Sequence, residues 1–160
     1  MAILHLRNRI RQMTIDEPVL RDYFDYLAGR LRIPANHSVE VDFCSERRIK
    51  LLKETHFGRR ETTDCIAFPT EFPELGPEVP QVYGQVFICP EFVAGQALEH
   101  GSSFGDECLF VFTHGLLHLT GQVDDSPQQR KAMHERQRRL MAKGGFVGNA
   151  PYPFRWATSP

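Results

Sequence analysis

The sequence predicts a single α/β domain in which a mixed sheet of about four strands is surrounded by helices. Strand-like and helix-like segments alternate along the chain, which is the order typical of α/β proteins. The 160 residues, 41% hydrophobic and 24% charged, are ordinary for one soluble globular core. A third observation, a helix with histidines four residues apart, adds a metal-binding cleft to this fold.

In the first half of the chain we expect two strands, each followed by a helix. Residues 2–7 favour a first strand, and Pro18 then takes a first-turn position in a helix with apolar residues at helical spacing. Residues 38–43 alternate apolar and polar side chains, as a half-buried strand does. Ser45 can cap the next helix, which we expect to end near Phe57.

In the second half, residues 63–68 and 82–89 predict two further strands, followed by three helices. The proline-rich stretch between these strands, 69–81, is expected to be a loop and to form a flap over a site. The three helices are expected to begin at Pro90, at Ser103 with Asp106, and at Ser126 with Gln129, and to end near Gly101, Gly121 and Gly144. Residues 146–160 contain three prolines and show no periodicity. We therefore expect a domain over 1–145 and a tail over 146–160 that is poorly ordered or lies on the surface.

Charge and cysteine content narrow the class of protein. The net charge of −1 means that any site for nucleic acid must be local. The four cysteines, which form no CxxC pair, are expected to be reduced, buried and structural, as in a cytoplasmic protein. We expect no association with a membrane, because no signal pattern and no long apolar run are present.

The stretch THGLLHLTGQVDD, residues 113–125, predicts a metal site. His114 and His118 are four apart and so share one helix face, and Gly121 can adopt the positive φ that ends the helix. Asp124 can then return to the same ion, giving two nitrogens and one oxygen, a set that suits zinc. Asp125 is a rival third ligand, and nickel, cobalt or manganese remain open. The other interpretation is that both histidines are packing residues and Asp124 is a loop cap.

These residues resemble the signature of the YbeY family, bacterial metal-dependent endoribonucleases that act in ribosomal RNA maturation. That signature is H-G-x-L-H-L-x-G-x-D-H, and it is matched here by His114, Gly115, Leu117, His118, Leu119 and Gly121. TDCIAFP (63–69) is similar to the family's T-D-V-L-S-F-P, and GQVFI (84–88) to its G-D-I-x-I. The resemblance covers about residues 45–143, and it implies an α/β fold with the metal in a cleft.

The chain departs from the family pattern at four positions. Asp124 takes the place of the last histidine, Val123 and Gln85 replace aspartates, and Phe57 stands where many members carry an arginine thought to contact RNA. Arg59 and Arg60 are the nearest cations and are expected to bind RNA instead.

The resemblance implies a single-strand-specific endoribonuclease that acts on small-subunit ribosomal RNA, in contact with the small ribosomal subunit or its proteins. One zinc ion would be held by His114, His118 and Asp124 with a position left for water, and no general base is identified. The alternative from another class is a ribosome-biogenesis factor that binds RNA without cleaving it and carries a structural metal. A peptide or amide hydrolase is disfavoured, because Gly115 stands where zinc proteases of similar spacing have a glutamate.

Basic residues concentrate in a few segments. The last helix has six cations against one acid over 126–143, and further arginines lie at the N-terminus and around the second helix. Such side chains supply most phosphate contacts to RNA. The plainer interpretation of the last helix is a solvated basic face above a core stripe of Met133, Leu140 and Met141.

Overall fold

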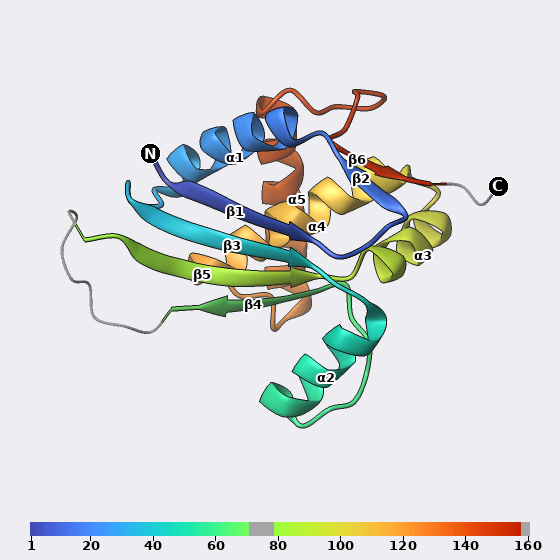
Figure 1. Ribbon diagram of the computed structural model, residues 1–160. Helices are drawn as coiled ribbons and strands as arrows, with labels where there is room; N and C mark the ends of the chain where they lie inside the picture. Colours follow the sequence, from blue (N-terminus) through green and yellow to red (C-terminus); the bar gives the residue numbers. More distant parts are fainter. Residues whose placement is uncertain (71–78, 158–160) are drawn as a thin grey trace.

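The computed structural model describes residues 1–70 and 79–157 (Figure 1). The strands are β1 (Ile3–Asn8), β2 (Met13–Ile15), β3 (His37–Phe43), β4 (Cys65–Pro69), β5 (Gln81–Ile88) and β6 (Phe154–Trp156). The helices are α1 (Glu17–Leu31), α2 (Glu46–Phe57), α3 (Pro90–His100), α4 (Phe104–Leu119) and α5 (Pro127–Lys143). The predicted flap over 69–81 lies largely outside the described residues.

Four strands form the predicted mixed sheet, in the order β1-β3-β5-β4. β1, β3 and β5 are parallel, and β4 pairs antiparallel to β5. Parallel neighbours need a crossover connection, and α1 supplies it between β1 and β3. On central β3, Val39, Val41 and Phe43 are wholly buried while Glu40 and Asp42 face the other side, as the alternation predicted.

The helix starts follow the predicted caps. The Oγ atoms of Ser45, Ser103 and Ser126 accept hydrogen bonds from the backbone N–H three residues ahead. Ser126 and Gln129 form a reciprocal capping box, whereas Ser103 is paired only one way, because Asp106 instead binds Arg138 of α5. Serine caps satisfy N–H groups that the helix cannot bond itself, which fixes where each helix begins.

The C-terminal segment differs from the expectation of a poorly ordered or surface tail. β6 pairs antiparallel with β2, with Ile15 opposite Phe154 and Met13 opposite Trp156. The Phe154 ring is 2% exposed and lies 5.5 Å from the Phe43 ring, centroid to centroid. Both strands have three residues, too few to show periodicity, and tertiary burial of Phe154 supplies their order. The domain boundary at residue 145 stays a prediction.

Helix α4, which carries both motif histidines, is the central element of the core. It lies behind the sheet in Figure 1 together with α5, and it also packs against β6 and α3. Its close approach to the sheet depends on Gly115, since a Cβ there would lie 2.6 Å from Val86 Cγ1 and 3.1 Å from Cys65 Sγ. Within the described residues, no helix has both the length and the apolar character needed to cross a bilayer. All four cysteines are free, and Cys44, Cys89 and Cys108 are buried.

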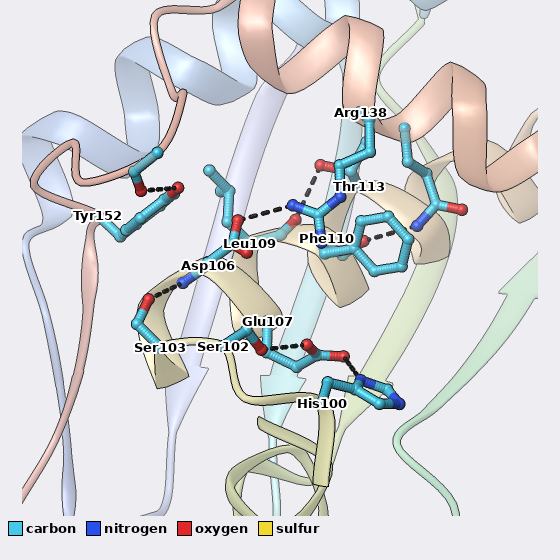
Figure 2. A network of polar contacts seen from close by, with 12 residues as sticks. His100, Ser102, Ser103, Asp106, Glu107, Leu109, Phe110, Thr113, Arg138 and Tyr152 are labelled. Carbon is cyan, nitrogen blue, oxygen red and sulfur yellow. Dashed lines mark hydrogen bonds and ion pairs between the residues drawn. The ribbon is translucent and has the colours of Figure 1, made fainter. Parts of the chain in front are cut away.

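Polar contacts anchor the N-terminal half of α4 (Figure 2). The buried Glu107 carboxylate accepts a hydrogen bond from Ser102 Oγ at 2.8 Å and lies 3.1 Å from His100 Nδ1, which ties α4 to the end of α3. Asp106 forms an ion pair with Arg138, whose guanidinium lies 4.4 Å from the Phe110 ring centroid. Helix α4 is thus fixed to both neighbouring helices, which gives its histidine-bearing end a rigid base.

Candidate metal centre

The three predicted ligands come together where α4 ends. His114 and His118 lie on one face of the last turns of α4, with their Nε2 atoms 2.9 Å apart. Gly121 has φ +93°, the left-handed conformation that lets the chain turn back. Asp124 Oδ2 then lies 3.5 Å from each Nε2. The structure therefore brings the three side chains into one cluster, whose ligand atoms lie within 4.8 Å of one another.

The opposite nitrogen of each imidazole is bound to an oxygen. His118 Nδ1 lies 3.0 Å from the Gln122 carbonyl oxygen, and His114 Nδ1 lies 3.0 Å from Gln137 Oε1. The Gln137 amide nitrogen donates to the Phe110 carbonyl, so its oxygen is the atom that faces His114. Because both oxygens can only accept, each Nδ1 is the donor in its hydrogen bond, and each ring turns its Nε2 atom toward the cluster.

This arrangement suits a cation. Two Nε2 atoms and a carboxylate oxygen face one another at short range, and a positive charge among them, either a proton or a metal ion, stabilises the group. Burial lowers the pKa of His114 and the nearby His118 adds to the effect, although the Gln137 hydrogen bond and the carboxylates of Asp64 and Asp124 oppose it. The net effect is a lowered pKa of His114, which favours its neutral form, and the neutral imidazole is the form that binds metals. The donor set therefore fits a divalent ion.

Asp125, the rival ligand, is exposed on the same loop and does not join the cluster. Gly115 faces the sheet, so a longer side chain there would meet Val86 rather than enter the cleft. The place of the protease glutamate is thus occupied by a helix–sheet contact, which weakens the peptide-hydrolase alternative.

Gln137 is a site residue that the sequence analysis did not identify. Its side chain is fully buried on α5, and it orients His114 in the way that outer partners orient metal-binding histidines. The available signal was a polar residue within the apolar stripe of Met133, Leu140 and Met141, all of which are buried as predicted. A buried glutamine needs hydrogen-bond partners, and those partners lie on α4.

Two arginines of the basic helix α5 hold the loop that carries Asp124. Arg136 Nη1 donates to Gln122 Oε1 at 2.6 Å, and Arg130 Nη1 donates to the Asp124 carbonyl at 3.4 Å. With Arg138 bound to α4, half of the six cations of this helix are engaged within the protein. The basic face is therefore partly structural.

The other arginines that the sequence predicts to contact RNA lie outside helix α5. Arg59 and Arg60 are exposed just beyond α2, and Arg60 Nε is 3.9 Å from Glu54 Oε2. Arg7, Arg9 and Arg48 surround a cavity of about 550 Å³ on the open face of the sheet, together with Glu40 and Asp42. A different cavity, of about 540 Å³, borders the metal cluster itself and has His118, Gly121 and Gln122 in its wall.

Comparison with known proteins gives a consistent family match. A family model described as Endoribonuclease YbeY matches residues 5–145, and so begins well before the predicted limit of 45. A Beutenbergia cavernae protein named Endoribonuclease YbeY is 30% identical over 133 residues, 81% of this chain and 89% of the relative. A Geobacillus protein of the same name is 29% identical over 142 residues, 85% of this chain and 88% of the relative.

A solved structure supports the fold. The solution structure of TM1509 from Thermotoga maritima aligns with a TM-score of 0.54 at 21% identity, and the alignment covers 93% of this chain and 99% of that chain. At this identity the likeness bears on the architecture, and it agrees with the α/β fold described above.

Proposed function

The chain belongs to the YbeY endoribonuclease family, and on that premise we propose that it is a metal-dependent endoribonuclease that processes ribosomal RNA. We take the substrate to be single-stranded segments of precursor small-subunit RNA. The metal ligands in this proposal are His114, His118 and Asp124.

One observation carries the proposal: two imidazole nitrogens and a carboxylate oxygen converge on one point where α4 ends. The two Nε2 atoms are 2.9 Å apart, and Asp124 Oδ2 is 3.5 Å from both. Each Nδ1 is bound to an oxygen, so neither ring can rotate away without losing a hydrogen bond. Such pre-orientation favours metal binding over a role in packing.

The surroundings favour a catalytic rather than a structural metal. Structural zinc sites are closed by four protein ligands, whereas catalytic sites have three and an open position. Within residues 1–70 and 79–157 the cluster offers three ligands, and the side chains of His114, His118 and Asp124 remain 18%, 28% and 29% exposed. The cavity beside His118 gives a substrate access to that open side. A structural metal in a non-catalytic factor has no need of these features.

A divalent ion held there would lower the pKa of water and polarise a phosphodiester oxygen. The protein's own residues contribute orientation: Gln137 and the Gln122 carbonyl fix the two imidazoles. Arg130 and Arg136 hold the loop so that Asp124 stays in place. We assign the flanking phosphates to Arg59 and Arg60, which are exposed on the segment between Phe57 and Thr63 of the cavity wall.

We further propose that the ion is a single zinc ion, because two imidazoles and a carboxylate form a set common at catalytic zinc. We also propose that the protein works in the cytoplasm, on RNA in contact with the small ribosomal subunit or its proteins. The free cysteines and the ribosomal RNA substrate fit that compartment.

The proposal is tested by incubating precursor small-subunit RNA with the wild-type protein, His118→Ala and Asp125→Ala, each supplied with zinc. We expect the wild type and Asp125→Ala to cleave at equal rates, because Asp125 lies outside the cluster. His118→Ala should lose both cleavage and metal retention, because it removes one of three ligands.

Equal cleavage by His118→Ala would contradict the proposal. Absence of cleavage by the zinc-loaded wild type, with RNA or ribosome binding that survives His118→Ala, would favour the non-catalytic factor.

A further inference from the structure

We propose that the cavity beside the metal cluster is a nucleobase subsite, in which Phe57 stacks on a base flanking the scissile phosphodiester. The inference rests on the proposed function, since it takes single-stranded RNA as the occupant. It assigns a specificity role to an aromatic side chain that is outside the metal cluster.

Two exposed apolar side chains border this cavity from different elements. Phe57, at the end of α2, is 56% exposed, and Val123, on the loop between the metal ligands, is 49% exposed. His118 lies in the same wall. Exposed large apolar side chains are costly to solvate when grouped, and grouping them beside a reactive centre is typical of a binding site.

The ring of Phe57 packs against an aromatic ring of the sheet. It lies nearly parallel to the ring of Phe68 on β4, with an interplanar angle of 14° and centroids 6.1 Å apart. Phe68 in turn packs edge-on against Phe87 of β5, with centroids 5.9 Å apart. Phe57 therefore packs against the sheet through Phe68, while more than half of the surface of Phe57 stays exposed and available to a ligand. An aromatic face that is already ordered costs little further entropy on binding.

The chemistry of the lining favours a base over a phosphate at this position. Lys53 is the cation in the wall, and its Nζ is engaged by Glu61 Oε1 at 3.0 Å. The other side chains there include Phe57, Ile66, Ala67 and Val123, which offer apolar contact rather than charge. Aromatic side chains bind single-stranded RNA by stacking on bases. Continuity with His118 places such a base next to the phosphodiester that the metal cluster would engage.

The test uses a short oligouridylate carrying one 2-aminopurine, whose fluorescence is quenched on stacking, titrated with metal-free full-length protein. Phe57→Ala is expected to weaken binding by roughly 5- to 150-fold and to abolish the quenching, the range that stacking of one base on an aromatic ring gives. Phe57→Trp should retain both signals. Leu51→Ala is the matched control, because Leu51 is 54% exposed on the same helix and does not line the cavity.

Cleavage then separates this inference from the proposed function. With zinc present, an abasic nucleotide next to the cut should slow the wild type as much as Phe57→Ala does, and the two changes together should add little. If the wild type cleaves and Phe57→Ala matches Leu51→Ala in binding, quenching and cleavage, the subsite is overturned while the nuclease stands. If Phe57-dependent quenching is found but zinc-loaded protein never cleaves, the subsite stands and the nuclease fails. Binding of apolar peptides with no response to RNA would also overturn the subsite.

Discussion

Replacing Gln137 by methionine should weaken metal binding although residue 137 touches no metal. Gln137 Oε1 lies 3.0 Å from His114 Nδ1, and its side chain is fully buried. Methionine has a similar shape but no acceptor of comparable strength, so a buried N–H loses its partner. A lost partner of this kind costs about 1–3 kcal/mol of folding free energy. Loss of an outer partner to a ligating histidine lowers metal affinity by about 10- to 100-fold.

Metal affinity is measured by titrating zinc into the metal-free protein in competition with a chromogenic chelator. Gln128→Met is the control on the same helix, since Gln128 is exposed, and it should bind zinc as the wild type does. Gln137→Glu restores an acceptor for Nδ1 and should bind zinc more tightly than Gln137→Met. Wild-type affinity in Gln137→Met would refute the claim that this hydrogen bond orients His114.

Three further changes test other parts of the structure. Gly115→Ala places a Cβ 2.6 Å from Val86 Cγ1 and should lower the free energy of unfolding, measured in urea, by about 1–3 kcal/mol. Gly95→Ala is the control on α3, where the new Cβ meets no atom within 4 Å, and it should raise that free energy by about 0.5–1 kcal/mol. A change of the same sign in both variants would contradict the packing argument. Phe154→Ala should lower the free energy of unfolding by about 3–5 kcal/mol, because it removes a buried ring. A change near zero would show that the C-terminal segment does not pack into the core. Burial raises the pKa of Cys44 to about 12, so iodoacetamide at pH 8 should label it far more slowly in the folded protein than in urea, and equal rates would argue against that burial.

Much of the fold could be predicted because its signals are local. The alternation over β3 and the serine caps of α2 and α5 depend on residues only a few positions apart, and the structure confirms them. β2 and β6 could not be found in this way, because each has three residues and is defined by its partner. Their pairing joins positions at opposite ends of the chain, and no pattern within either segment contains that information.

In the candidate site, too, local features could be predicted from the sequence and contacts between elements could not. His114 and His118 are four residues apart on one helix, so their proximity follows from helical geometry, and Gly121 then lets the chain turn back toward them. Gln137 reaches His114 from another helix, and only the packing of α4 against α5 brings the two together. The interpretation of α5 as a freely basic face was incomplete for the same reason, since Arg130, Arg136 and Arg138 have partners on other elements.

The central claim, that His114, His118 and Asp124 hold one ion that supports cleavage, is tested most directly by a stoichiometric titration. Chelator-stripped protein is supplied with increasing zinc, and bound metal and the initial rate of precursor-RNA cleavage are measured in the same samples. The account predicts that the wild type does not cleave without metal, and that its cleavage rate rises linearly with added zinc and stops rising at one equivalent. Asp124→Ala should need at least tenfold more zinc to reach any activity. Full cleavage by the stripped protein, or one tightly bound equivalent with no cleavage, would contradict it.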